Sequence, residues 1–417
     1  MKNYEIRDIA LAPSGHQKIE WVKNNMPILR SLEEEFKREK PFEGVKISLS
    51  VHLEAKTAYL CKVLAAGGAK MAVTGSNVLS TQDDIAAALV SEGMNVYAYH
   101  GATAEEYDRH IEMTLEHKPN IIIDDGGDLV SMVHKKRPDL AEETWGGSEE
   151  TTTGVNRLKA MERDGILKFP MVAANDANCK HLFDNRYGTG QSVWTSIMEN
   201  TNLIIAGKTV VVAGYGWCSK GIAMRAAALG ASVIVTEIDA VKAMEARMDG
   251  YSVMTMTKAA PLGDFFVSAT GCMHTITVDH MKTMKDGAIL SNAGHFNVEI
   301  DMDGLEKMAV DKKETRKNIM GYRLPTGQMI HVIAEGKLVN IAADMGHPAE
   351  IMDMSFAVQA LSAMYIKDNY KKLGKKVIDV SAEIDDVVSA RKLAAWGIEI
   401  DKLTPEQEKY LNSWNFE

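Results

Sequence analysis

The stretch GKTVVVAGYG, residues 207–216, places a short β-branched run directly before two glycines, and a helical stretch follows through Gly230. Strand, glycine turn and helix in this order are typical of a dinucleotide-binding βαβ unit. Gly214 would permit the tight turn and Gly216 the close approach of a pyrophosphate, whereas Ser219 replaces the third glycine. An ordinary glycine turn fits this degenerate pattern equally well, so the interpretation depends on its surroundings.

Support comes from the end of the next expected strand, where the sequence has Glu237. In dinucleotide sites a carboxylate about 20 residues after the first glycine binds the ribose 2′-hydroxyl. Glu237 follows Gly214 by 23 residues (237 − 214). Because a carboxylate repels a 2′-phosphate, the sequence favours NAD over NADP.

Alternating strands and helices extend from this unit in both directions. Short β-rich runs alternate with helical stretches over residues 45–130 and again from residue 207 to residue 340. Such alternation predicts parallel sheets covered by helices. We predict an α/β protein with two doubly wound parallel-sheet domains. A substrate domain is expected at residues 1–185 and 341–375, a Rossmann domain at 186–340, and a C-terminal helical segment at 376–417.

The composition excludes several classes of protein. The 417 residues are 46% hydrophobic and 25% charged, which rules out a disordered chain. A net charge of −10 without clustered Lys or Arg argues against a nucleic-acid partner. No segment approaches the ~20 apolar residues that span a bilayer, so we expect a cytoplasmic protein with no membrane partner. Four cysteines without a C-x-x-C pair predict reduced thiols, and no bound metal is expected.

A polar stretch lies between the two alternations. It brings Lys180, Asp184 and Asn185 close together in sequence. A lysine beside a nicotinamide could act as a base on a hydroxyl group. From residue types alone, a solvated ion pair on a loop is the more common reason for such a cluster.

Segments along the whole chain resemble those of S-adenosyl-L-homocysteine hydrolases. These are STQD (80–83), DDGGDL (124–129), SEETTTG (148–154), NDANCKHLFDNRYG (175–188), IAGKTVVVAGYG (205–216), NAGHF (292–296), EGKLVN (335–340) and MGHP (345–348). The resemblance implies a homotetrameric enzyme with tightly held NAD, acting on a nucleosyl-homocysteine thioether or on nucleoside and L-homocysteine. The 3′-hydroxyl is oxidised, homocysteine is eliminated, water adds, and the ketone is reduced again.

The resemblance also implies roles for individual residues. Lys180 would be the base for the 3′-hydroxyl, which requires a lowered pKa, and His52 and Asp83 would handle protons at C5′. The implied catalytic residues are His52, Asp83, Lys180, Asp184 and His295. The implied substrate contacts are Glu54, Lys56, Thr57, Glu150, His347 and Met352. The implied NAD contacts are Thr151, Thr152, Thr153, Asn185, Gly214, Gly216, Trp217, Cys218, Glu237, Thr270 and Asn340.

Three departures from the family pattern carry expectations of their own. Ser219 is expected to loosen helix packing or NAD affinity, and Thr189 stands where many relatives have cysteine, so a thiol at that position cannot be essential. The tail, Trp414 to Glu417, lacks the Lys- and Tyr-bearing extension that in many relatives reaches a neighbour's NAD site. The resemblance therefore still implies a tetramer, but it does not imply cross-subunit NAD contacts for this chain.

The segment after His52 bears on which base is recognised. Many relatives carry threonine and glutamate where this chain has Glu54 and Lys56. His52, Glu54 and Lys56 would share one side of the strand if it continued through them. Lysine only donates hydrogen bonds and ionised glutamate only accepts them. They suit O6 and N1–H of hypoxanthine, so we predict S-inosyl-L-homocysteine rather than S-adenosyl-L-homocysteine. The alternative for the two charges is that they pair with each other or face solvent.

Two other classes of function remain open from the sequence. A simple NAD-dependent dehydrogenase would accumulate NADH, and an NAD-binding regulator descended from the family would bind without turnover. The presence of Lys180, Asp184, His295 and His52 argues against the regulator.

Overall fold

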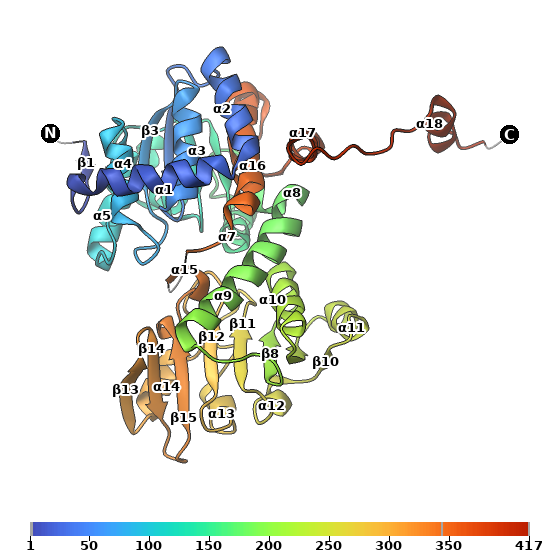
Figure 1. Cartoon of the computed structure of the whole chain (residues 1–417). Helices are drawn as coiled ribbons and strands as arrows, with labels where there is room; N and C mark the ends of the chain where they lie inside the picture. The colour runs from blue at the N-terminus through green and yellow to red at the C-terminus, as the bar shows by residue number, and fades with distance from the viewer. Residues whose placement is uncertain (1–2, 343–344, 416–417) are drawn as a thin grey trace.

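The computed structural model describes residues 3–342 and 345–415. It has two lobes, each built on an eight-stranded sheet, and α9 (Thr189–Thr201) runs from the upper lobe into the lower one (Figure 1). The two-domain α/β fold predicted from the alternation is confirmed. No helix among the described residues is long and apolar enough to cross a membrane.

The first sheet is parallel throughout. In pairing order its strands are β1 (Tyr4–Glu5), β4 (Asn95–Tyr97), β3 (Lys70–Thr74), β2 (Lys46–Ser50), β5 (Ile121–Asp124), β6 (Gly146–Glu149), β7 (Met171–Ala173) and β16 (Val377–Asp379). The helices of this lobe are α1 (Ala12–Asn24), α2 (Pro27–Glu39), α3 (Ala55–Ala66), α4 (Asp83–Ser91), α5 (Ala104–Leu115), α6 (Asp128–Lys136), α7 (Thr152–Arg163) and α16 (Ala349–Asn369). The strand order reverses between β2 and β5, which is where doubly wound sheets bind ligands.

The second sheet has the Rossmann order and ends in an antiparallel hairpin. Its strands are β10 (Ser252–Val253), β9 (Ser232–Thr236), β8 (Thr209–Ala213), β11 (Phe265–Ser268), β12 (Ile289–Asn292), β15 (Met329–Ile333), β14 (Ile319–Arg323) and β13 (Asp311–Arg316). Its helices are α10 (Trp217–Ala228), α11 (Ala240–Met248), α12 (Met256–Ala259), α13 (Val278–Met281), α14 (Met302–Met308) and α15 (Val339–Ala342). The order reverses between β8 and β11, directly beside the glycine turn.

The C-terminal segment is divided differently from the prediction. β16 pairs with β7, and α17 (Ala382–Ala395) buries Val388 in the core of the first lobe, so residues 377–395 belong to that domain. Only the part beyond α17, with α18 (Pro405–Leu411), extends away from both lobes (Figure 1). The prediction for the tail includes Phe416 and Glu417, which lie outside the described residues.

Candidate active site

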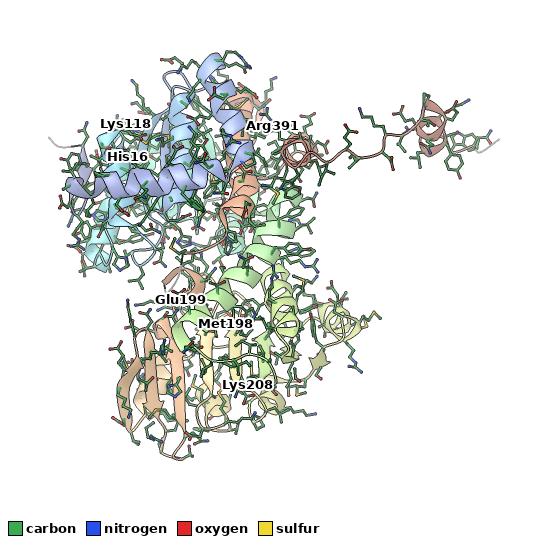
Figure 2. All side chains as sticks on the ribbon, in the orientation of Figure 1. His16, Lys118, Met198, Glu199, Lys208 and Arg391 are labelled. Atoms are coloured by element: carbon green, nitrogen blue, oxygen red, sulfur yellow. The ribbon has the colours of Figure 1, made fainter. Side chains whose placement is uncertain are left out.

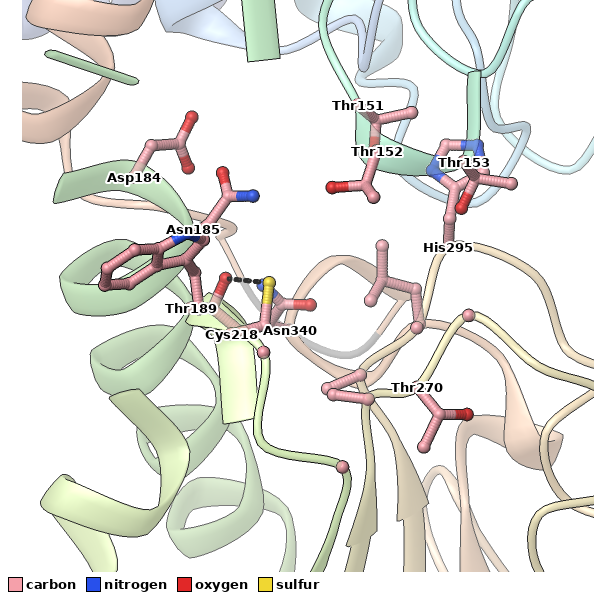
Figure 3. A pocket seen from close by; sticks show the side chains of 18 of the residues that line it. Thr151, Thr152, Thr153, Asp184, Asn185, Thr189, Cys218, Thr270, His295 and Asn340 are labelled. Atoms are coloured by element: carbon pink, nitrogen blue, oxygen red, sulfur yellow. Dashed lines mark hydrogen bonds between the residues drawn. The ribbon is translucent and has the colours of Figure 1, made fainter. Parts of the chain in front are cut away.

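One cavity of about 1130 Å³ lies between the carboxyl ends of the two sheets. Side chains of both lobes line it, and Figure 3 shows Asp184 and Asn185 at one side and Thr152, Thr153 and His295 at the other. The cavity therefore joins the two positions at which the strand orders reverse.

Nearly all the residues predicted from the sequence line this cavity. They are His52, Glu54, Lys56, Thr57, Glu150, Thr151, Thr152, Thr153, Lys180, Asp184, Asn185, Gly214, Gly216, Trp217, Cys218, Glu237, Thr270, His295, Asn340, His347 and Met352. Asp83 is not among the lining residues.

The glycine turn has the form expected at a pyrophosphate site. Gly214 has φ +93°, a conformation that favours glycine, and a Cβ at Gly216 would meet no atom within 4 Å in the described structure. Ser219 is fully buried, and its Oγ donates to the Ala269 carbonyl at 3.0 Å. The serine therefore attaches α10 to the end of β11 instead of loosening the helix, contrary to the expectation from sequence.

Two further groups fit a bound dinucleotide. The Glu237 carboxylate is held by the backbone N–H groups of Tyr215 at 2.7 Å and Ile238 at 2.7 Å, and it keeps lone pairs for ribose hydroxyls. Asn340 donates through Nδ2 to Ser192 Oγ at 2.9 Å, but its buried Oδ1 has no hydrogen-bond partner within the described part of the chain. An unpaired buried acceptor is costly, so a ligand amide is a suitable partner for it.

Lys180 lies at the centre of a buried polar cluster. Its Nζ donates to Asn185 Oδ1 at 2.8 Å and lies 3.3 Å from Asp184 Oδ2 and 3.6 Å from Glu150 Oε1. Gln359 Nε2 donates to Glu150 Oε2 at 2.6 Å, which holds this carboxylate in the cluster.

The electrostatics of this cluster contradict the expectation that Lys180 has a lowered pKa. Burial lowers the pKa of Lys180, but Asp184 and Glu150 outweigh it and raise the pKa above its ordinary value. Burial raises the pKa of Glu150 to about 7, against the attraction of Lys180. The lysine is therefore an ammonium group in this state, beside a carboxyl group that can exchange a proton near neutral pH.

Asp184 is fixed by groups from the segment that returns to the first domain. Its Oδ2 accepts from Ser355 Oγ at 2.8 Å, and its Oδ1 contacts His347 Nδ1. Although burial opposes ionisation, Lys180 and His347 hold the pKa of Asp184 well below its usual range. A permanently ionised carboxylate at this place can accept hydrogen bonds from hydroxyl groups.

A second polar cluster joins the two domains. His52 Nε2 lies 3.4 Å from Asp125 Oδ2, and His295 Nδ1 of the Rossmann domain lies 4.0 Å from Asp125 Oδ1. A Cβ at Gly126 would lie 2.6 Å from His295 Nε2, so a glycine is needed for this approach. Burial lowers the pKa of His52 to about 4, which leaves a neutral imidazole, and Ser80 Oγ holds its Nδ1 at 2.8 Å.

The acidic residue beside His52 in this cluster is Asp125, not Asp83 as the sequence predicted. Asp83 begins α4, where its Oδ1 accepts from the backbone N–H of His100 at 2.7 Å and its Oδ2 lies 3.8 Å from Arg7. Asp125 follows β5 at the reversal of strand order, and its motif DDGGDL was already visible in the sequence. The position of this motif at the end of an expected strand is the sequence signal that points to Asp125.

Glu54 and Lys56 line the cavity, but they lie at the start of a helix and not on the strand that the sequence predicted. β2 ends at Ser50, and Lys56 lies in the first turn of α3, so the two residues do not continue a strand. Their side chains form an ion pair at 3.1 Å, and Lys56 Nζ also donates to the Met345 carbonyl at 3.0 Å. Both are largely buried, so the charges pair with each other without turning to solvent.

The fold and the cavity together define a two-domain α/β enzyme that uses a dinucleotide cofactor. Family models for S-adenosyl-L-homocysteine hydrolase and for its NAD binding domain match residues 3–145 and 185–346. The chain belongs to the S-adenosyl-L-homocysteine hydrolase family, and its cofactor is NAD.

Curated relatives match along the whole chain. An adenosylhomocysteinase of Pyrococcus abyssi is 55% identical over 412 residues, 99% of this chain and 98% of the relative. An S-inosyl-L-homocysteine hydrolase of Methanocaldococcus jannaschii is 54% identical over 411 residues, 99% of each chain. An adenosylhomocysteinase of Aquifex aeolicus is 55% identical over 412 residues, also 99% of each. Overall identity therefore does not distinguish the two bases.

Proposed function

We propose that this enzyme reversibly hydrolyses a nucleosyl-L-homocysteine to a nucleoside and L-homocysteine. The observation that carries the proposal is the meeting, in one cavity, of a dinucleotide turn, the buried cluster around Lys180 and the cluster of His52 and Asp125. A simple dehydrogenase would need only the first two. The second cluster supports a further step on the same substrate.

NAD, when bound, supplies reversible hydride transfer at C3′ and a positive charge that disfavours a nearby ammonium. Lys180 takes the proton of the 3′-hydroxyl once its own proton has passed to Glu150, whose Oε1 lies 3.6 Å away. Asp184 orients the ribose by accepting a hydrogen bond from a hydroxyl group. The two carboxylates and the lysine thus act as one unit in the oxidation and its reversal.

The cluster of His52 and Asp125 supports proton transfer at C5′. A neutral imidazole can take a proton from the entering water, and the imidazolium, once formed, can give a proton to the leaving thiolate. Asp125 has its pKa lowered by His52 and His295 despite burial, so it is a carboxylate that stabilises the imidazolium. His295 closes the cluster from the Rossmann side.

The function is tested in the synthetic direction with purified protein. Loss of free thiol from homocysteine in the presence of nucleoside, without net NADH, is the expected result. Denatured protein should release about one nicotinamide nucleotide per chain. Net formation of NADH would instead identify a dehydrogenase, and binding without thiol loss would identify a regulator.

We further propose that the base is hypoxanthine, so that the thioether is S-inosyl-L-homocysteine. The Lys56 ammonium has three N–H groups, and its two partners among the described residues, the Glu54 carboxylate and the Met345 carbonyl, leave one N–H for a purine oxygen. Such a donor matches O6 of hypoxanthine but not the amino group of adenine. The Glu54 carboxylate can accept from N1–H of hypoxanthine.

The base is tested by comparing inosine with adenosine as partners of homocysteine. We expect a higher kcat/KM for inosine, because a wrongly matched edge leaves buried groups unpaired, which can cost up to ~10⁴–10⁵ in selectivity. Glu54→Thr together with Lys56→Glu should shift the preference toward adenosine. The double change alters the net charge by −1 (+1 for Glu54→Thr and −2 for Lys56→Glu), so Lys62→Gln, at a half-buried position of α3 outside the cavity, is the charge-matched control. Unchanged selectivity in the double variant would assign base recognition to other residues.

The exposed tail supports a homo-oligomer, which we propose to be the tetramer implied by the family. Leu411 and Trp414 are 65% and 93% exposed on an arm that stands away from both lobes (Figure 1). Seven large apolar side chains between Trp396 and Trp414 are exposed, and apolar groups gathered in one segment favour a subunit contact. Light scattering after size exclusion should give four chains, and Trp414→Ser with Leu411→Ser should reduce that mass.

A further inference from the structure

Lys180 lies at the start of a helical stretch whose first turn has no cap from its own side chains. α8 (Asn178–Lys180) is a single turn, and it leads directly into the π-helical segment η4 (His181–Gly188). The residue before α8 is Ala177, which has no side chain that can accept the first backbone N–H groups. These donors need an acceptor from elsewhere in the molecule.

The acceptor is Asp385, more than two hundred residues further along the chain. Its Oδ2 accepts from the N–H of Asn178 at 2.8 Å and its Oδ1 from the N–H of Cys179 at 2.7 Å. The Cys179 thiol also donates to the Asp385 carbonyl at 3.4 Å. A carboxylate that accepts two N–H groups fixes both position and orientation of the peptide.

Asp385 is itself on a firmly attached element. α17 is held by the buried ion pair of Lys392 with Asp353, at 3.1 Å, and Val388 is fully buried beneath it. Arg391 donates to Ser31 Oγ of α2 at 2.9 Å, which ties α17 to that helix (Figure 2). The helix therefore transmits its position to Asn178 and Cys179 through the Asp385 carboxylate.

We propose that Asp385 is a positioning residue for Lys180, which makes the C-terminal segment part of the catalytic apparatus. The inference rests on the role proposed for Lys180. The carboxylate fixes the peptide one residue before the lysine, so that Nζ lies 2.8 Å from Asn185 Oδ1 and 3.6 Å from Glu150 Oε1. A misplacement of about 1 Å at a reacting group can cost about 100-fold in rate.

The test measures the first half-reaction alone. Inosine or adenosine is added without homocysteine, and the rate of reduction of the bound NAD is followed together with the nucleoside Kd. For Asp385→Ala we expect a rate about 10- to 100-fold lower, with Kd changed less than about 3-fold. Asp385→Asn keeps one acceptor oxygen, so its rate should lie between the rates of Asp385→Ala and wild type. Asp386→Ala removes the same charge from the exposed neighbouring position and should behave as wild type.

A purely structural role predicts a different pattern. It would lower the thermal midpoint and weaken the nucleoside Kd and the rate in parallel, and that result would overturn the proposal. If Asp385→Ala does not fold, the comparison of Asp385→Asn with Asp386→Asn decides, and equal rates would overturn it. Lys180→Ala separates the role proposed for Lys180 from the role proposed for Asp385. Normal oxidation in that variant refutes the role of Lys180, whereas loss there with a normal rate in Asp385→Ala refutes the present proposal alone.

Discussion

Six parallel strands of each sheet share one order, but the two sheets carry different residues at their carboxyl ends. Around the reversal in the first sheet, the ends of β5 and β6 carry four acidic residues, Asp124, Asp125, Glu149 and Glu150, all buried. At the reversal in the second sheet, β8 is followed by Gly214 and β11 by small residues. The fold supplies the position, and the residues after each strand decide what is done there.

The difference has a physical basis. A pyrophosphate needs backbone N–H groups and room, which glycine provides, and a buried carboxylate beside it would repel it. Proton transfer needs ionisable groups whose pKa values are shifted by burial and by each other. In the proposed mechanism, the Rossmann domain therefore supplies the cofactor turn, and the first domain supplies most of the groups that move protons. The predictions below test that division, from the largest expected effect to the smallest.

Lys180→Ala should abolish most of the oxidation of the nucleoside. Loss of one general base typically costs ~10²–10⁴ in rate. The measurement is reduction of the bound NAD after nucleoside is added, with Lys159→Ala on the exposed side of α7 as the control. Normal reduction in the Lys180 variant would show that the proton chemistry lies elsewhere.

Asp125→Asn should retain 3′-oxidation but slow thioether cleavage by about 100-fold, because the His52 imidazolium would lose its carboxylate. Reduction of bound NAD and release of thiol are measured separately. Asp83→Asn is the matched control and should leave both nearly normal. If Asp83→Asn slowed thioether cleavage more than Asp125→Asn, the role at C5′ would return to Asp83.

Asp124 should make stability depend on pH. Burial raises its pKa to about 7, compared with about 3.9 for an unfolded aspartate. Its contribution to the free energy of unfolding is therefore full below about pH 4. As pH rises toward 7, this contribution is lost by about 1.4 kcal/mol per pH unit. Asp124→Asn should make the fall in unfolding free energy between pH 5 and pH 7 shallower by about 2–3 kcal/mol, as measured by urea unfolding. Asp108→Asn on the surface should keep the wild-type slope, and equal slopes in both variants would contradict the assignment.

Glu237→Gln should weaken the binding of NAD on the order of 10-fold, because a charge-assisted acceptor for the ribose hydroxyls is lost. The amount of nicotinamide nucleotide retained after dialysis measures this. The effect on NADP should be the reverse, since a repelling charge is removed. Undiminished retention of NAD would mean that another residue binds the ribose.

Ser219→Gly should have the smallest effect. It removes the hydrogen bond to the Ala269 carbonyl, worth about 0.5–1.5 kcal/mol, and leaves the glycine turn itself unchanged. We expect a small drop in the thermal midpoint of the Rossmann domain and NAD affinity within about 3-fold. Tighter NAD binding in the glycine variant would show that the serine does loosen the site.

Much of the fold and of the site was predictable because the relevant signals are local. Gly214, Gly216 and Glu237 lie in one strand, turn, helix and strand unit, so their spacing follows from the geometry of that unit. Alternating apolar runs likewise specify both sheets. Lys180, Asp184 and Asn185 lie within six residues, and their common cluster required only that this segment be helical.

What the sequence alone determined is the class of fold, the cofactor turn and the family. What only the tertiary structure decided is which acid meets His52, how Lys180 is charged and what holds it. His52 and Asp125 follow different strands and His295 lies in the other domain, so their contact depends on the strand order and on how the two domains are placed. The pKa of Lys180 depends on Glu150 and on burial, which are properties of packed neighbours and not of spacing along the chain.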